Sequence, residues 1–218
     1  MKYLNNKQSK RVKRGMTRFF TADWHLCSDS VFKLAERPFK NVDHMNHVIM
    51  RNANQRAYHK DDVIYHLGDF YNKSKNKSLE CYRQKYTYFY DKIESQMVMI
   101  EGNHDIQNNV KCLGKLFWMQ LGKYNVSLGH FPTIISKYDV DLTPECYKNI
   151  GRNHIHICGH VHKSWKWILD EENMILNINV GIDVWKYSIV SESELIRYIE
   201  TIIRNNISID PKRLFLKQ

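Results

Sequence analysis

The chain has 218 residues, of which 43% are hydrophobic and 12% aromatic, so it suits one folded domain and is not a disordered chain. Its formal net charge of +10 is concentrated at the two ends, because residues 19–202 hold equal numbers of acidic and basic side chains. No apolar run reaches the roughly 20 residues that cross a bilayer, and the basic start lacks the apolar segment of a secretory signal. We therefore expect a cytoplasmic protein with no membrane partner.

Short apolar runs predict six buried strands, in chain order at 18–22, 63–67, 97–100, 125–129, 154–158 and 174–180. Apolar residues spaced by three and four predict a helix at 42–58, with Asn41 as its N-cap. Residues 78–94 and 191–204 are also predicted to be helical, the latter with a capping box at its start. Strands that alternate with helices indicate an α/β domain with parallel strands.

The two ends of the chain have two open interpretations. Residues 17–203 are assigned to one domain, 1–16 to a basic N-terminal arm and 204–218 to a basic C-terminal tail. Such an arm binds phosphate backbones through counterion release, or it is a solvated, disordered tail.

A polar cluster follows each of the predicted strands, and the clusters read DWH, GDF, GNHD, HFP, GHVH and GID in chain order. Ligands of α/β sheets bind at the carboxyl ends of the strands. One such cluster is typical of a polar turn. Five that offer Asp, His and Asn together indicate a metal site.

The clusters supply ligands in pairs and beside glycines. Asp23 and His25 are two residues apart, as are His160 and His162, and such residues point to the same side of an extended segment. Glycines precede the other candidates and let the backbone approach a site closely. The predicted ligands are Asp23, His25, Asp69, Asn103, His130, His160 and His162. Imidazole with carboxylate suits zinc, iron or manganese, and seven ligands suit two ions that share one carboxylate.

The motif order D-x-H, G-D, G-N-H-D, G-H-x-P and G-H-x-H resembles the calcineurin-like metallophosphoesterases over about residues 17–200. The stretches RPF at 37–39, YHLGDF at 65–70 and NVGIDVW at 179–185 resemble a small, compact bacterial and phage branch. The resemblance implies a four-layer αββα sandwich with a dinuclear site at its rim. For a viral protein, the cytoplasm would be that of the host.

The resemblance also implies a role for each residue of the site. It places Asp23, His25, Asp69 and His162 around one metal ion. It places Asn103, His130 and His160 around the other, with Asp69 as the bridge. His104 then protonates the leaving oxygen or steadies the transition state, and Asp105 orients His104.

The function predicted on this basis is a dinuclear phosphodiesterase for a nucleotide or a nucleic acid, in which a metal-bridging hydroxide attacks phosphorus in line. Manganese is the expected metal, with iron, zinc, nickel and magnesium as alternatives. The domain has no spare segment for a capping domain, which favours a diester. A phosphomonoesterase or protein phosphatase is the alternative, weakened by Ile106 at a position where an Arg would be expected. A scaffold without chemistry and a nucleic-acid-binding module that uses the arm are further alternatives.

Three residues are candidates for substrate contacts. Arg37 is either a phosphate clamp or a surface ion-pair partner. Ser28 and Cys27 stand where related sequences carry a His that contacts phosphate. Lys73 belongs to a lysine-rich stretch that would recruit an anion, or that is a solvated loop.

The remaining histidines and the cysteines receive structural interpretations. His66 either orients a ligand or is a satisfied core histidine. His154 and His156 are predicted to face one side of a strand. The five cysteines, odd in number and without a CxxC pair, are predicted to be reduced thiols, and Cys27 a small packed side chain or a thiolate ligand.

Overall fold

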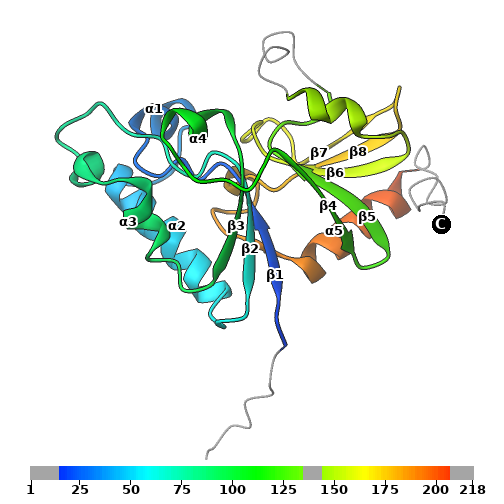
Figure 1. The fold of residues 1–218 in the computed structure, drawn as a ribbon, viewed down its shortest axis with the longest axis horizontal. Coiled ribbons are helices and arrows are strands. Elements are labelled where there is room, and N and C mark those ends of the chain that lie inside the picture. The colour runs from blue at the N-terminus through cyan, green and yellow to red at the C-terminus, as the bar shows by residue number, and fades with distance from the viewer. Residues whose placement is uncertain (1–14, 135–143, 207–218) are drawn as a thin grey trace, which may run out of the picture.

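The computed structural model describes residues 15–134 and 144–206. Within them, a four-stranded and a five-stranded β-sheet pack against each other through a shared apolar core (Figure 1). Nearly all of the basic arm and of the C-terminal tail lies outside the described residues, so those predictions stay open. None of the described helices has both the length and the apolar character that a membrane span requires.

The four-stranded sheet has the order β3-β2-β1-β9. Its strands are β1 (Arg18–Thr21), β2 (Val63–Leu67), β3 (Gln96–Ile100) and β9 (Val190–Ser191). The first three run parallel, as the apolar runs predict, and β9 pairs antiparallel with β1.

The five-stranded sheet has the order β4-β5-β6-β8-β7. Its strands are β4 (Leu116–Leu121), β5 (Tyr124–Gly129), β6 (His154–Cys158), β7 (Trp167–Asp170) and β8 (Ile175–Asn179). The three inner strands are parallel and correspond to predicted runs, whereas the antiparallel edge strands β4 and β7 have no run of their own. Both edge strands are half-buried, which blurs their hydrophobic pattern.

The helices cover the four-stranded sheet and close the shared core. They are α1 (Asp29–Leu34), α2 (Val42–Arg56), α3 (Tyr86–Tyr90), α4 (Asn103–Gln107) and α5 (Glu192–Asn205), with 3₁₀ helices η1 (Glu80–Arg83), η3 (Glu145–Asn149) and η4 (Ile182–Val184). Asn41 caps α2 and a capping box starts α5, as predicted. The helix predicted at 78–94 is instead η1 and α3, separated by Gln84 in an extended conformation.

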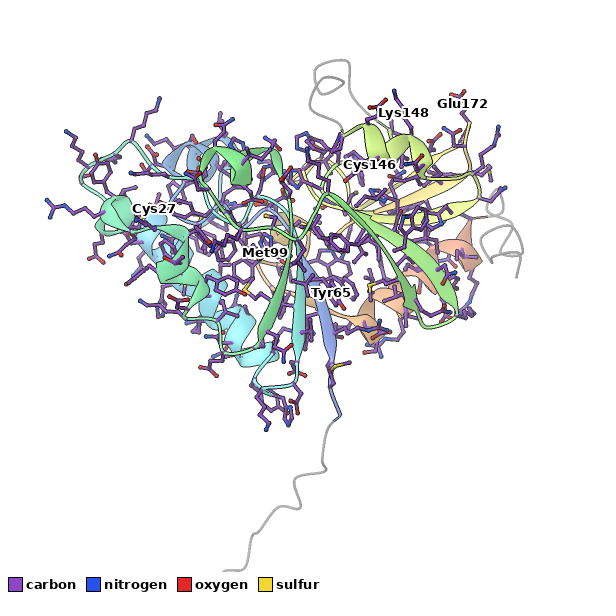
Figure 2. The ribbon with its side chains drawn as sticks, in the orientation of Figure 1. Cys27, Tyr65, Met99, Cys146, Lys148 and Glu172 are labelled. Carbon is purple, nitrogen blue, oxygen red and sulfur yellow. A yellow bond between two sulfur atoms is a disulfide. The ribbon has the colours of Figure 1, made fainter. Side chains whose placement is uncertain are left out.

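Alternating side chains of the four-stranded sheet feed two apolar clusters. On β2, Ile64 points to the cluster beneath α2, and Tyr65 packs against the cluster between the sheets. Met99 of β3 belongs to the α2 side, so Tyr65 and Met99 lie on opposite sides of this sheet (Figure 2). The mixed α/β sandwich of two sheets with helices confirms the predicted fold class.

Candidate metal centre

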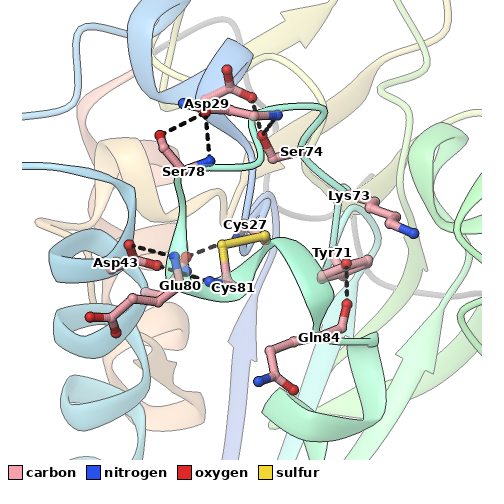
Figure 3. Close-up of a disulfide and its surroundings, with 12 residues drawn as sticks. Cys27, Asp29, Asp43, Tyr71, Lys73, Ser74, Ser78, Glu80, Cys81 and Gln84 are labelled. Atoms are coloured by element: carbon pink, nitrogen blue, oxygen red, sulfur yellow. Dashed lines mark hydrogen bonds between the residues drawn. A yellow bond between two sulfur atoms is a disulfide. The ribbon is translucent and has the colours of Figure 1, made fainter.

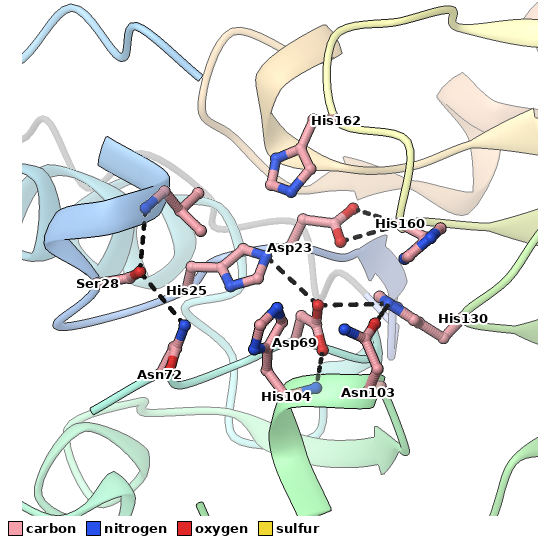
Figure 4. A network of polar contacts seen from close by, with 12 residues as sticks. Asp23, His25, Ser28, Asp69, Asn72, Asn103, His104, His130, His160 and His162 are labelled. Carbon is pink, nitrogen blue, oxygen red and sulfur yellow. Dashed lines mark hydrogen bonds and ion pairs between the residues drawn. The ribbon is translucent and has the colours of Figure 1, made fainter. Parts of the chain in front are cut away.

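Loops that follow five strands bring polar residues of distant segments to one edge of the sandwich (Figure 4). These residues are Asp23, His25, Asp69, Asn103, His104, His130, His160 and His162. Asp23, His25, Asp69 and His130 are buried, and the other four are partly exposed. The arrangement is therefore a buried floor with an accessible rim.

Asp69 lies at the middle of this arrangement. Its Oδ2 is 3.4 Å from Nε2 of His25 and 3.4 Å from Nε2 of His130. Its Oδ1 accepts a hydrogen bond from the backbone N–H of His104 at 2.9 Å. The same Nε2 of His130 is also 3.0 Å from Oδ1 of Asn103. One carboxylate thus stands between two sets of side chains that share it.

Three overlapping groups of side chains hold their ligand atoms within 4.8 Å of one another. They are Asp23 with His25 and His162, His25 with Asp69 and His104, and Asp23 with Asp69 and His130. His104, predicted as a proton donor, therefore also lies within ligand distance. His160 belongs to the neighbourhood by other contacts: its backbone N–H donates to both carboxylate oxygens of Asp23, and its ring centroid is 5.1 Å from that of His130.

Five of the predicted ligands have a left-handed backbone conformation. The φ values are +59° for Asp23, +48° for His25, +58° for Asp69, +71° for His160 and +46° for His162. Non-glycine residues adopt this conformation uncommonly, and it concentrates at functional sites. The paired ligands therefore converge through alternating left-handed turns. This corrects the prediction that an extended segment aims each pair at one point.

Gly68 and Gly102 allow the turns around Asp69 to pack closely. Gly68 has a φ of +92°, and a Cβ added there would lie 2.5 Å from Nδ1 of His130. A Cβ on Gly102 would lie 2.3 Å from Oδ1 of Asp69. Any side chain at either position would displace the centre, in agreement with the prediction that these glycines permit close approach.

The rings of His130 and His162 are oriented so that one nitrogen of each faces the centre. Nδ1 of His130 donates to the carbonyl of Leu67 at 2.8 Å, and Nδ1 of His162 donates to Oδ2 of Asp183 at 2.9 Å. His25 is buried and neither of its ring nitrogens makes a hydrogen bond. A buried imidazole without a hydrogen bond is costly unless a ligand takes its lone pair, so the residues fit divalent cations.

The electrostatics keep a negative charge on Asp69 and leave His25 neutral. Burial opposes ionisation of Asp69, but the charge and hydrogen bond of His130 hold the pKa of the Asp69 carboxyl far below its usual range. Burial also acts against a charged His130, yet the Asp69 carboxylate raises the pKa of His130 to about 9. For His25, burial dominates and lowers the pKa well below its ordinary value. Neutral imidazole and ionised carboxylate are the forms that bind metal ions, so His25 and Asp69 are in the binding form, and His130 would release a proton when a metal ion binds.

Asp105 holds the backbone of the centre. Its Oδ2 accepts from the N–H groups of Asp69 at 2.7 Å and Gly102 at 2.9 Å, and its Oδ1 accepts from Phe70 at 3.0 Å. This corrects the prediction that Asp105 orients the His104 ring, because both of its oxygens are committed to backbone. The cause is local, since α4 starts at Asn103 and directs Asp105 inward to the helix start.

The predicted substrate contacts are also revised. The guanidinium of Arg37 is buried against Asp183 and against backbone carbonyls, so it is neither a phosphate clamp nor a surface partner. Ser28 is buried and is the N-cap of α1, where its Oγ accepts from Val31. Lys73 is exposed, and its backbone N–H donates to Asn108, which in turn donates to the carbonyl of His104.

Asp183 and Asn179 are site residues that the sequence analysis did not assign. Asp183 contacts His162, and Nδ2 of Asn179 donates to the carbonyls of His162 and Trp165 at 2.8 Å each. Both belong to the stretch NVGIDVW. Asp183 follows the predicted strand at 174–180 as the ligands follow theirs, and that position was the signal that could have identified it. Asn179 lies inside the predicted strand and had no such signal.

Cys27 and Cys81 form a disulfide, which corrects the prediction of reduced thiols (Figure 3). The bond ties the turn that carries His25 to η1, whose first N–H groups at Glu80 and Cys81 donate to Asp43 of α2. Cys112, Cys146 and Cys158 are free. Cys27 is therefore no thiolate ligand, and the thiol argument for a reducing compartment no longer holds.

The other buried histidines have structural positions. His154 and His156 both contact Oγ of Ser127, at 3.0 Å and 2.7 Å, on the outer face of the five-stranded sheet, as predicted. His66 is buried between the rings of Trp24 and Phe70, and neither of its nitrogens has a hydrogen-bond partner. His66 thus neither orients a ligand nor is a satisfied core histidine.

Comparisons with known proteins show the family to which the chain belongs. Residues 19–187 match the model of the calcineurin-like phosphoesterase superfamily domain. An uncharacterized protein of Methanocaldococcus jannaschii is 30% identical over 186 residues, covering 84% of this chain and 90% of that protein. A protein of unknown function from Aquifex aeolicus has a TM-score of 0.61 at 20% identity, covering 84% of this chain and 99% of that one. The phosphoesterase Yfce from E. coli has a TM-score of 0.39 at 14% identity, over 75% of this chain and 78% of that one.

Proposed function

We propose, on the premise that this chain belongs to the calcineurin-like phosphoesterase superfamily, that it is a dinuclear phosphodiesterase for nucleotides or nucleic acids. The protein is a metal-dependent hydrolase of phosphoric esters, and it binds divalent metal. The proposal concerns the number and kind of metal ions, the role of each residue and the class of substrate.

The observation that carries the proposal is the position of Oδ2 of Asp69, 3.4 Å from a ring nitrogen of His25 and 3.4 Å from one of His130. A carboxylate between two sets of donors suits two cations. Asp23, His25 and His162 would hold one, and Asn103, His130 and His160 the other. Bound divalent cations would supply the positive charge that an in-line displacement at phosphorus needs. Manganese is the proposed metal, because mixed imidazole and carboxylate donors suit it.

His104 is proposed to protonate the leaving oxygen. It lies in the first turn of α4, and its ring centroid is 5.2 Å from that of His25. The side chain is partly exposed at the rim, where an ester oxygen can reach it. Imidazole exchanges protons near neutral pH and so suits general acid catalysis.

The inward position of Arg37 supports a diester in preference to a monoester. A terminal phosphate is a dianion at neutral pH, and an arginine fork is the usual side-chain clamp for it. Arg37 was the candidate for that clamp, but Asp183 and two backbone carbonyls occupy its donors. A singly charged diester needs less positive charge beyond the metal ions.

The lysine-rich loop supports a polyanionic substrate. Lys73, Lys75 and Lys77 are exposed, and the contact between Lys73 and Asn108 ties this loop to α4, the helix of His104. Replacing the three lysines by alanine should raise the KM for an oligonucleotide and leave that for a small chromogenic diester unchanged. In the unchanged chain, the slope of log KM for the oligonucleotide against log salt concentration should be steeper. The triple variant should lose about 0.7 of this slope for each phosphate that the lysines neutralise. An unchanged oligonucleotide KM would remove the loop from the substrate path.

The test of the proposed function is hydrolysis of a chromogenic phosphodiester beside the matching monoester, with manganese and then with chelator. We expect chelator-sensitive cleavage of the diester, which His104→Ala slows and His47→Ala, a change on the exposed face of α2, leaves intact. Cleavage of the monoester alone would establish the phosphatase alternative. No cleavage with any of manganese, zinc, iron or nickel would contradict the proposed chemistry.

A further inference from the structure

The guanidinium of Arg37 lies beneath the metal centre and reaches two parts of it. Nε and Nη2 each donate to one carboxylate oxygen of Asp183 at 2.9 Å. Nη2 also donates to the carbonyl of Asp23 at 2.6 Å, and Nη1 to that of Trp24 at 2.8 Å. The planar fork therefore joins a carboxylate to the left-handed turn that carries Asp23 and His25.

Asp183 passes this constraint to His162. Its Oδ2 accepts from Nδ1 of His162 at 2.9 Å. An ionised carboxylate only accepts, so the proton of the neutral ring must be on Nδ1. The lone pair is then on Nε2, which leaves this nitrogen free for the centre, where His162 is grouped with Asp23 and His25.

Stability alone does not explain the buried ion pair between Arg37 and Asp183. Well-packed apolar residues of similar volume would stabilise the fold about as well as a buried pair of charges. An apolar pair could not hold the carbonyls of Asp23 and Trp24 or the ring of His162. The backbone of His162 is held as well, because Nδ2 of Asn179 donates to the carbonyl of His162 at 2.8 Å.

We propose that Asp183 and Arg37 are positioning residues of the metal centre: one buried ion pair sets the ring of His162 and the turn of Asp23 and His25 together. This inference rests on the proposed assignment of His162 and Asp23 as metal ligands. Partners of this kind fix the tautomer and the direction of a ligating histidine, and their loss commonly weakens metal binding about 10- to 100-fold.

The test is a calorimetric titration of the metal-free full chain with manganese alone. Asp183→Asn should weaken binding about 10- to 100-fold, and Arg37→Lys, which keeps the charge but loses the fork, should also weaken it. Glu192→Gln is the matched control, because Glu192 pairs with the guanidinium of Arg18 far from the site. The control should bind manganese as the unchanged chain does. Asp183→Asn with unchanged manganese affinity would overturn the inference.

His162→Ala separates this inference from the proposed function. If His162→Ala loses affinity and Asp183→Asn does not, the metal assignment stands and the positioning role fails. If the unchanged chain binds no manganese, the proposed function itself fails.

A measurement on the unchanged chain keeps the inference testable if the variants do not fold. A long-range ¹H–¹⁵N spectrum of the zinc-loaded protein should place the ring proton of His162 on Nδ1 and zinc on Nε2. Zinc on Nδ1, or a proton on Nε2, would contradict the role of Asp183.

Discussion

The two halves of the proposed metal centre are anchored in different ways. The His162 half comprises Asp23, His25 and His162, and the side chains of Arg37 and Asp183 hold it. The His130 half comprises Asn103, His130 and His160, and the backbone carbonyl of Leu67 holds its central ring. An anchor made of side chains can be removed by one substitution, whereas a carbonyl at the end of a buried strand cannot. The His162 half is therefore the one that sequence changes can tune.

Asp69→Asn should have the largest effect, because Asp69 is the residue that both halves share. The change keeps the shape and removes the charge between the two proposed cations. We expect the activity to fall at least about a thousandfold, with loss of bound metal. The measurements are kcat/KM and metal content per chain, with the exposed Asp61→Asn as control. A variant that keeps two metal ions and a tenth of the activity would contradict a shared carboxylate.

His104→Ala tests whether His104 belongs to the His162 half as a ligand or stands above it as an acid. We expect kcat to fall about 10²- to 10⁴-fold with unchanged metal content. The loss should be smaller for a nitrophenyl leaving group, which needs little protonation, than for an alkyl leaving group. Equal losses with reduced metal content would make His104 a ligand, as its grouping with His25 and Asp69 allows.

The disulfide constrains the His162 half alone. Cys27 follows His25 by two residues and is bonded to Cys81, whereas Cys158, which precedes His160 by two residues in the other half, is a buried free thiol. Closing a loop across a separation of 54 residues stabilises a fold by up to about 4 kcal/mol. Cys81→Ser, or reductant, should lower the free energy of unfolding by a substantial part of this amount.

Denaturant titrations with and without reductant measure this effect, and Cys112→Ser is the control that removes a free thiol. Alkylation of the unreduced, denatured chain should label three cysteines, which are Cys112, Cys146 and Cys158. Five labelled cysteines would mean that the bond does not form in solution. Insensitivity to reductant would remove its contribution to stability.

That the residues of both halves lie together could be predicted from the sequence, but their anchors could not. Asp, His and Asn after apolar runs are a local pattern, because residue type and the ends of buried strands are both readable in a short window. The contact between Arg37 and Asp183 joins positions 146 residues apart, and no local pattern encodes it. The left-handed turns at Asp23 and His25 were equally hidden, since non-glycine residues in that conformation depend on tertiary contacts.

The dependence on tertiary contacts also explains the errors in the predicted secondary structure. Inner strands such as β6 are buried throughout and read clearly, whereas the edge strand β4 is half-buried and does not. The predicted helix at 78–94 is interrupted at Gln84, because the aromatic residues there favour helix only weakly and Asp43 and Cys27 fix η1 from outside. The disulfide itself could not be deduced from the spacing of five cysteines.

His66 lies outside the proposed centre and can be compared with His25. Of the replacements considered, that of His66 should have the smallest effect. Like His25 it is buried without a hydrogen-bond partner, but it contacts Trp24 and Phe70 and takes no part in either half. A buried imidazole without a hydrogen bond costs stability, and only His25 would offset that cost by binding metal. Removal of His66 should therefore stabilise the fold, whereas removal of His25 should abolish metal binding. His66→Phe should add about 1–3 kcal/mol to the free energy of unfolding at pH 7, less any strain from the larger ring.

The pH dependence identifies the cause of this gain. Burial lowers the pKa of His66 to about 3, so the folded chain keeps it neutral while the unfolded chain protonates it below about pH 6.5. Stability from a neutral His66 is therefore lost as the pH falls from about 6.5 toward 3, by about 1.4 kcal/mol per pH unit. The advantage of His66→Phe should grow over that range, measured by urea unfolding at pH 7, 6 and 5. A constant advantage would assign the effect to packing, and a destabilised variant with unchanged metal affinity would show that the cavity requires the smaller ring.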